Sequence, residues 1–209
     1  MKPIGPYPEP IASGVRAEGF SLIEMLISLT IMLILFTMMY GFGSRSNQMN
    51  QKKKCQSNLQ KMYIALQIYC NDSNGKFPVA TNARSSEDAL DVLVPRYSSD
   101  TAIFVCPGSK DSALPAGESL RKGRISYAYY MGRTASDGEL VLASDKQVDT
   151  KAKLPGDKVF SDNGKFPGNN HHKYGGTFLF CDGGMKSSPA VAAIALPLST
   201  NVVLLNPKP

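Results

Sequence analysis

The chain has 209 residues, and its 23 Lys and Arg residues exceed its 17 Asp and Glu residues, for a net charge of +6. This mild basic excess is compatible with binding nucleic acid or acidic surfaces but requires neither. Four cysteines are too few for a small disulfide scaffold, and the absence of a CxxC pair argues against zinc.

Residues 25–43, MLISLTIMLILFTMMYGFG, contain no charged side chain. At 1.5 Å per residue a helix of this length covers about 28 Å, close to the thickness of a hydrocarbon core. The segment continues into GFGSRSNQMNQKKK without the A-x-A-like site that follows the shorter apolar centre of a secretory signal. A buried core helix is the alternative, but the length and the unbroken apolar character favour a single transmembrane helix.

Glu24 is an isolated acid near the start of this segment. A charge costs up to roughly 3 kcal/mol at mid-membrane and less near an end, so such a residue is a functional candidate. The alternative is a carboxylate that simply reaches back to the interface. Basic residues are more numerous after the span (Arg45 and residues 52–54) than before it (Lys2 and Arg16), which alone would place the large domain in the cytoplasm.

The sequence GFSLIEMLISL, residues 19–29, resembles the class III signal of type IV pilins and type II secretion pseudopilins. In that family a peptidase cuts on the cytoplasmic side after the glycine, and the new N-terminus is methylated. The resemblance implies cleavage after Gly19, methylation of Phe20 and an assembly role for Glu24. It also implies a cytoplasmic leader and a periplasmic C-terminal domain, against the count of basic residues.

The resemblance gives the acid a physical role. Cleavage exposes an amine on Phe20 in the same low-dielectric layer, and Glu24 of one subunit neutralises the amine of its neighbour when subunits stack. The implied partners are other pilins or pseudopilins in a homo- or hetero-polymer, the prepilin peptidase and an inner-membrane assembly platform. The implied organisation is a leader at 1–19, a transmembrane and filament-core helix at 20–44, and an exported globular domain at 45–209.

The helix is predicted to continue past the membrane, over residues 21–72. Apolar residues recur at steps of four and three on one face: Cys55, Leu59, Met62, Leu66 and Tyr69. The sequence NDSNGKFP then ends the helix, because Gly75 suits a left-handed C-cap and Pro78 prevents continuation.

The remaining sequence predicts one short helix and several strands. SSEDALDVLVPRY is typical of a helix that begins after Ser85 or Ser86. AIFVCP, ISYAYYMG, ELVLAS and GTFLFCDGG are strand candidates, and the tail ALPLSTNVVLLNPKP is expected to pack or to add an edge strand. The fold class is therefore α+β, with a long N-terminal helix packed on a small antiparallel sheet, as in type IV pilins.

A second resemblance covers the C-terminal domain. CQSNLQKMYIALQIYCNDSNGKFP, FVCP, SYAYY, VLASD and HHKYGGTFLFCDGG are similar to the pilin-like H-X9-DG proteins, which are abundant in planctomycetes. His172 precedes Asp182 and Gly183 by the nine residues of that motif. The alternative for this pair is a histidine and an aspartate that simply satisfy each other near a tight turn.

The sequence favours a protein without catalytic residues or a resident metal. His171, His172 and Asp182 could begin a metal or hydrolytic centre, but no nucleophile signature or Glu-rich ligand set accompanies them. Asp145, Asp162 and Asp182 are candidate calcium ligands by analogy with major pseudopilins. Calcium needs six or more oxygens, and no dense acidic loop is present.

The cysteine connectivity can be narrowed from the predicted helix. Cys55 and Cys70 on one helix are about 22 Å apart, too far for a disulfide. Of the two remaining pairings we favour Cys55 with Cys106 and Cys70 with Cys181 over the crossed arrangement. Four buried free thiols are the further alternative.

The sequence thus predicts a prepilin-like subunit that polymerises into a type II secretion pseudopilus or a type IV pilus-like filament. One alternative is a competence-type pilin that binds DNA, slightly supported by the charge of +7 after Glu24, although we expect no nucleic-acid partner. The other is a membrane-anchored surface protein that never polymerises.

Overall fold

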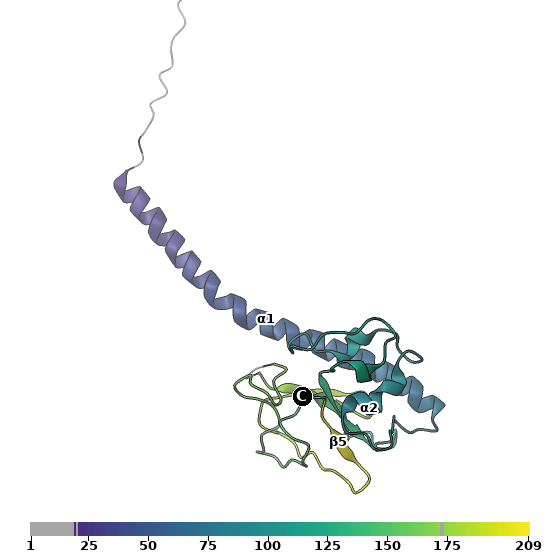
Figure 1. Cartoon of the computed structure of the whole chain (residues 1–209). Coiled ribbons are helices and arrows are strands. Elements are labelled where there is room, and N and C mark those ends of the chain that lie inside the picture. The colour runs from purple at the N-terminus through teal and green to yellow at the C-terminus, as the bar shows by residue number, and fades with distance from the viewer. Residues whose placement is uncertain (1–18, 20, 172–173) are drawn as a thin grey trace, which may run out of the picture. The chain divides into compact units, whose positions relative to one another are not determined.

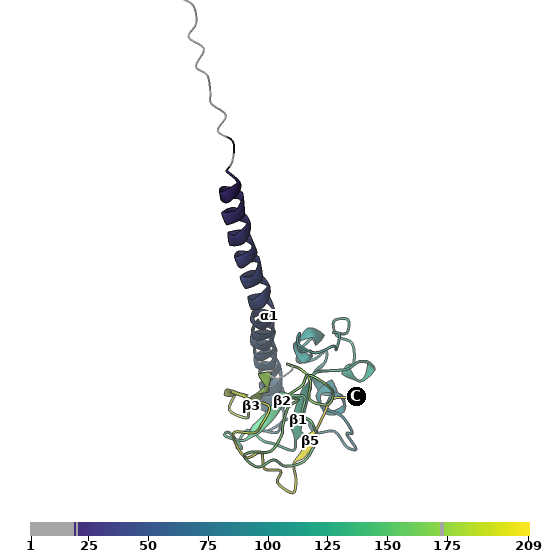
Figure 2. The same cartoon turned by 90° about the vertical axis from the view of Figure 1, so that its left-hand side faces the viewer.

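The computed structural model describes residues 19, 21–171 and 174–209. The chain divides into two units, Met1–Gly43 and Ser44–Pro209. Figures 1 and 2 show the elements from two directions. In chain order the helices and 3-10 turns are α1 (Leu22–Asp72), α2 (Ser86–Leu90), η1 (Asp91–Leu93), η2 (Thr101–Phe104) and η3 (Leu120–Lys122), and the strands are β1 (Tyr127–Met131), β2 (Val141–Asp145), β3 (Gly176–Phe180), β4 (Met185–Ser188) and β5 (Val203–Leu205).

Helix α1 agrees with the predicted range of 21–72. In the second unit it buries Cys55, Leu59, Met62 and Leu66 at the expected spacing, whereas the last predicted member, Tyr69, is only partly buried and the next residue, Cys70, is buried. The helix ends as the sequence indicates, because Gly75 has a φ of 79° and its N–H donates to the carbonyl of Cys70 at 2.9 Å.

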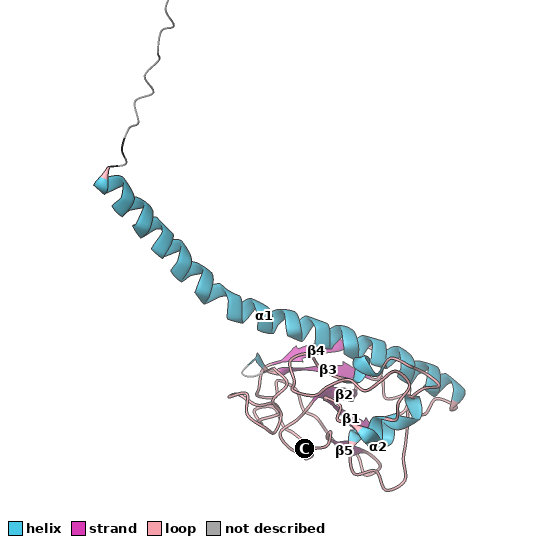
Figure 3. Cartoon of the chain, turned by 45° about the horizontal axis from the view of Figure 1, so that its top comes forward, coloured by secondary structure: helices cyan, strands magenta, loops and turns pink. Residues whose placement is uncertain are grey.

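The five strands form one antiparallel sheet in the order β4-β3-β2-β1-β5 (Figure 3). Strands β1 and β3 lie within the predicted segments, and β2 extends one residue beyond ELVLAS, to Asp145. The apolar tail supplies the edge strand β5, whose Leu205 pairs with Tyr129. An α+β class with a small antiparallel sheet is therefore confirmed.

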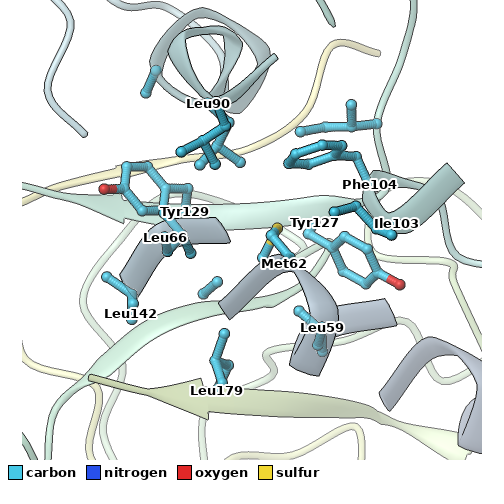
Figure 4. Packing of buried hydrophobic residues seen from close by; sticks show 14 of the residues in the cluster. Leu59, Met62, Leu66, Leu90, Ile103, Phe104, Tyr127, Tyr129, Leu142 and Leu179 are labelled. Carbon is cyan, nitrogen blue, oxygen red and sulfur yellow. The ribbon is translucent and has the colours of Figure 1, made fainter. Parts of the chain in front are cut away.

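The sheet is buried on both faces because its residues alternate between two cores. One face packs on the stripe of α1 and on α2: Figure 4 shows Leu59, Met62 and Leu66 of the helix among Tyr127 and Tyr129. The opposite face carries a second cluster, in which Tyr130, Phe178 and Leu204 pack under loop residues such as Phe160 and Leu196. The second unit is thus a helix, a sheet and a layer of loops.

Two local predictions were wrong. The segment AIFVCP, residues 102–107, forms no strand: its first half belongs to the 3-10 turn η2, because the Asp100 side chain accepts from the N–H of Ala102 at 3.0 Å and starts a turn. Strand β4 was not predicted, since its sequence MKSS is polar and mostly exposed. By contrast, α2 begins after Ser85 as expected.

Candidate functional site

The N-terminal motif lies at the start of α1. The carbonyl of Ser21 accepts from the N–H groups of Glu24 at 3.0 Å and Met25 at 3.2 Å, so Glu24 lies in the first turn, and its side chain is exposed. Gly19 is exposed, and a Cβ built on it would meet nothing within 4 Å. Phe20, the predicted methylation site, lies outside the described residues.

The helix after this motif presents an apolar surface on all sides. Residues Leu22–Met39 have a mean hydropathy of 2.3, and none of their side chains is buried. Three hydroxyls in the segment donate within the helix, from Ser28 to Met25, from Thr30 to Ile27 and from Thr37 to Ile34, at 2.8–2.9 Å. Internal bonding of this kind lowers the cost of placing hydroxyls in hydrocarbon. By length and composition the segment suits a single membrane span.

The Asp182–Gly183 pair forms the turn between β3 and β4. The Asp182 carboxylate accepts from the N–H of Gly184 at 2.7 Å, and Gly183 has a φ of 87°. A Cβ on Gly183 would also lie 2.6 Å from the ring of Tyr63 on α1, whose hydroxyl donates to the carbonyl of Cys181 at 3.0 Å. The pair therefore shapes a hairpin that packs on the helix. His172, its predicted partner, lies outside the described residues.

A second polar centre surrounds Asp145, which ends β2 and is fully buried. Its carboxylate accepts from the Asn170 side chain and from the N–H of Thr177, both at 2.8 Å. Nε2 of the buried His171 lies 3.3 Å from Asp145 Oδ1 and 3.5 Å from the sulfur of Cys106. Within the described part of the chain, His171 Nδ1 has no hydrogen-bond partner.

The predicted Cys55–Cys106 disulfide is present, and it closes this centre on the side of α1. The predicted Cys70–Cys181 bridge is not formed; both residues are buried free thiols. Burial raises the pKa of Cys70 and raises that of Cys181 to about 12, so both stay protonated and poorly nucleophilic near neutral pH. Their low-dielectric surroundings make them core residues rather than reactive groups.

Lys52 lies one turn before Cys55 and is half-buried. Its ammonium donates to the carbonyl of Tyr174 at 2.9 Å. Burial lowers the pKa of Lys52, and the negative charge of Asp145 acts in the opposite direction. A cation is thus placed on the side of the centre where the loop that carries His171 meets the helix.

The three candidate calcium ligands have unrelated surroundings. Asp145 belongs to the buried centre, Asp162 pairs with Lys158 at 2.8 Å on the surface, and Asp182 caps the hairpin turn. Among the described residues they do not share a ligand cluster. Sequence analysis singles out Asp145 and His171 for separate reasons. The fold brings them together beside the Cys55–Cys106 disulfide. The position of Asp145 at the end of a strand is the one sequence signal for this cluster.

Comparison with known proteins supports the N-terminal motif. Residues 15–40 match the family model described as the prokaryotic N-terminal methylation motif. Neither the curated proteins nor the solved structures include a match to this chain. The motif match, together with the apolar helix, indicates a prepilin-type N-terminus on a chain anchored by a single helix.

Proposed function

We propose that the chain is a structural subunit of a type IV pilin-like filament. It is cleaved after Gly19, methylated on Phe20, and polymerises through α1 into a type II secretion pseudopilus or a related pilus. The observation that carries this proposal is the methylation motif at 15–40, followed directly by a helix whose apolar surface is wholly exposed. A motif of this kind suggests a structural rather than an enzymatic role.

Glu24 supplies the assembly contact in this proposal. In the segment 22–39 it is the one ionisable side chain, and it accompanies three hydroxyls that are satisfied within their own helix. The carboxylate is thus the polar group left to meet a partner. After cleavage, the Phe20 amine of a neighbouring subunit provides that partner, so that two unfavourable charges become one pair.

In this proposal the C-terminal unit is the exported part and carries the disulfide. Its α1 stripe packs on the sheet, an arrangement that type IV pilins are expected to share. The peptidase acts on the cytoplasmic leader, and the assembly platform extracts the apolar helix from lipid into the filament. A non-polymerising anchored protein is the competing hypothesis. It would share the processing but not the dependence on Glu24.

Processing is tested by the intact mass of the protein purified from membranes of a host with a prepilin peptidase. We expect loss of residues 1–19 and the addition of one methyl group. Gly19→Val should leave an uncut precursor, and no described atom lies within 4 Å of its Cβ position to disturb folding. An uncut wild-type chain would contradict the proposal.

Assembly is tested with Glu24→Gln, which keeps the shape and removes the charge. We expect normal cleavage but at least about tenfold fewer filaments, because an unpaired charge in a low dielectric costs several kcal/mol. Thr37→Val is the matched control, since the Thr37 hydroxyl donates within its own helix, to the carbonyl of Ile34 at 2.8 Å. Filaments of Glu24→Gln as abundant and regular as wild type would refute the assembly role of Glu24. A processed wild-type chain that forms no filaments would favour the non-polymerising alternative.

A further inference from the structure

The buried centre contains four side chains of the kind that bind transition metals. The Cys55 and Cys106 sulfurs, a carboxylate oxygen of Asp145 and a ring nitrogen of His171 all lie within 4.8 Å of one another. All four residues are at most 1% exposed. The Nε2 atom of His171 faces both the Cys106 sulfur, at 3.5 Å, and Asp145 Oδ1, at 3.3 Å.

Two of these spacings match those of a tetrahedral site. Metal–ligand distances of about 2.3 Å for sulfur and 2.0–2.2 Å for nitrogen and oxygen place neighbouring ligand atoms roughly 3.3–3.8 Å apart. The two separations that involve His171 fall in that range. The two sulfurs are now bonded to each other and would need to separate to about 3.8 Å. Two thiolates, one imidazole and one carboxylate form a donor set suited to Zn²⁺.

The surrounding residues hold the ligands in place. The Asn170 side chain and the N–H of Thr177 fix the Asp145 carboxylate, and the N–H of Gly108 points at the Cys106 sulfur at 3.4 Å. Gly108 has to be glycine, because a Cβ there would collide with the Asn170 carbonyl and lie 2.8 Å from His171 Nδ1. Supporting hydrogen bonds of this type orient ligands in metal sites.

The disulfide by itself does not explain these neighbours. A disulfide is uncharged and needs no hydrogen-bond donor, yet a carboxylate and an imidazole are buried against it. Burying a polar group is costly unless it is hydrogen-bonded, and burying a charge is costly unless it is paired or coordinates a metal. Two thiolates and a divalent cation would give both groups a role.

We propose that Cys55, Cys106, Asp145 and His171 bind one Zn²⁺-class ion when the Cys55–Cys106 disulfide is reduced. The same two sulfurs then cross-link the oxidised chain and ligate metal in the reduced chain. Reduction by a dithiol transfers two electrons and two protons, which leaves two thiols on the chain and a disulfide on the reductant. Zn²⁺ then displaces the two thiol protons, which pass to solvent.

The spacing in sequence gave no sign of this site, because the ligands come from α1, the segment after η2, the end of β2 and the loop before β3. No CxxC pair is present, and the sequence had argued against zinc for that reason. The inference concerns only the unit Ser44–Pro209 and does not depend on polymerisation.

The test uses the full chain in detergent. The protein is reduced with a phosphine, which becomes a phosphine oxide with oxygen from water, and is titrated with Co²⁺ without oxygen. We expect one Co²⁺ per chain, sulfur-to-cobalt charge-transfer bands, tetrahedral d–d bands and displacement by Zn²⁺. The oxidised chain should show none of these bands. Reduced wild type without stoichiometric binding would overturn the proposal.

Variants assign the ligands. Cys55→Ser and Cys106→Ser should abolish the charge-transfer bands, and His171→Ala and Asp145→Asn should weaken Co²⁺ binding at least about tenfold. Matched controls are His172→Ala, Asp182→Asn and the double variant Cys70→Ala/Cys181→Ala, all of which should bind as wild type does. Binding that survives His171→Ala, or that is lost in the Cys70/Cys181 double variant, would refute this ligand set.

Loss of folding is separated from loss of a ligand by a second measurement. Near-ultraviolet circular dichroism of the buried tyrosines reports the packed core in each variant before and after reduction. Added Zn²⁺ should raise the unfolding midpoint of the reduced wild type, increasingly with its concentration, because the metal binds the folded state. If the reduced chain loses its fold, Zn²⁺ should restore it; failure to stabilise or restore it would count against the site.

Discussion

The two halves of α1 show how one helix is built for two environments. In the first, residues 22–39, apolar side chains cover every face and are exposed; Leu33 is 67% exposed. In the second, apolar residues occupy one stripe, and Leu66 is fully buried against the sheet. The absence of periodicity marks a surface that faces lipid or other helices all round, whereas a period near 3.6 marks a surface that faces one core.

The same charge placed in each half of α1 should have different consequences. Leu66→Lys buries an ammonium without a partner and should destabilise the second unit by at least about 4 kcal/mol, which abolishes its near-ultraviolet dichroism. Leu33→Lys should leave that signal unchanged but oppose membrane insertion by about 3 kcal/mol, measured by glycosylation-reporter insertion. If both variants lost the tyrosine signal equally, the two halves would not be independent.

The disulfide joins the second half of α1 to the segment after η2, so its removal should destabilise the second unit. Cys55 and Cys106 are 51 residues apart, and a loop of that length predicts a loss of about 4 kcal/mol when both become serine. Thermal unfolding in the presence of a chelator measures the difference. Cys70→Ala is a control that removes a buried thiol without a cross-link. The expectation would be contradicted if the double serine variant unfolded at a midpoint temperature no lower than that of the Cys70→Ala control.

Polar side chains on the two halves of α1 should also differ in how much they contribute to stability. Asn58 donates to the carbonyls of Ala102 at 3.2 Å and Val105 at 2.8 Å, whereas the Thr37 hydroxyl bonds its own helix. Asn58→Ala should lower the free energy of unfolding by about 1–2 kcal/mol, because two carbonyls lose their donor. Thr37→Val should change it by less than about 0.5 kcal/mol. Equal effects of the two substitutions would show that the hydrogen bonds from Asn58 to Ala102 and Val105 do not contribute to the free energy of unfolding.

The smallest expected effect lies away from α1, at the start of α2. The backbone N–H groups of Arg84 and Ser85 donate to the Asp88 carboxylate. These hydrogen bonds, mainly the one from Arg84, lower the pKa of the Asp88 carboxyl below the ordinary 3.8. A lowered folded-state pKa contributes stability above pH 3.8 that is lost as pH falls through the folded value. Asp88→Asn should therefore cost about 1 kcal/mol near pH 7 and progressively less below pH 4. A pH-independent difference would contradict this assignment.

Local chemistry made much of the fold predictable. The α1 stripe follows from spacing, its end from Gly75 and Pro78, and the start of α2 from Ser85, because each depends on residues close in sequence. The 3-10 turn η2 was missed because the cap supplied by Asp100 outweighs the strand propensity of the following residues. Strand β4 was missed because its neighbour β3, rather than its own composition, fixes its conformation.

The candidate sites divide in the same way. The N-terminal motif is contiguous, so a short pattern was sufficient to find it, and the family match covers the same residues. The buried centre depends on segments that meet only after the sheet has formed on α1. Sequence spacing directed attention to His172, whereas the fold places its neighbour His171 beside Asp145 and the disulfide.

The bond between Cys55 and Cys106 also limits how far the molecule can stretch. A chain pulled from its two ends cannot extend the 51-residue loop while that bond is intact, which withholds about 170 Å of contour length. Tension that enters through α1 therefore bypasses α2 and the turns enclosed by the loop. Those elements stay shielded from load, and the extensible part of the unit is confined to the residues before Cys55 and after Cys106.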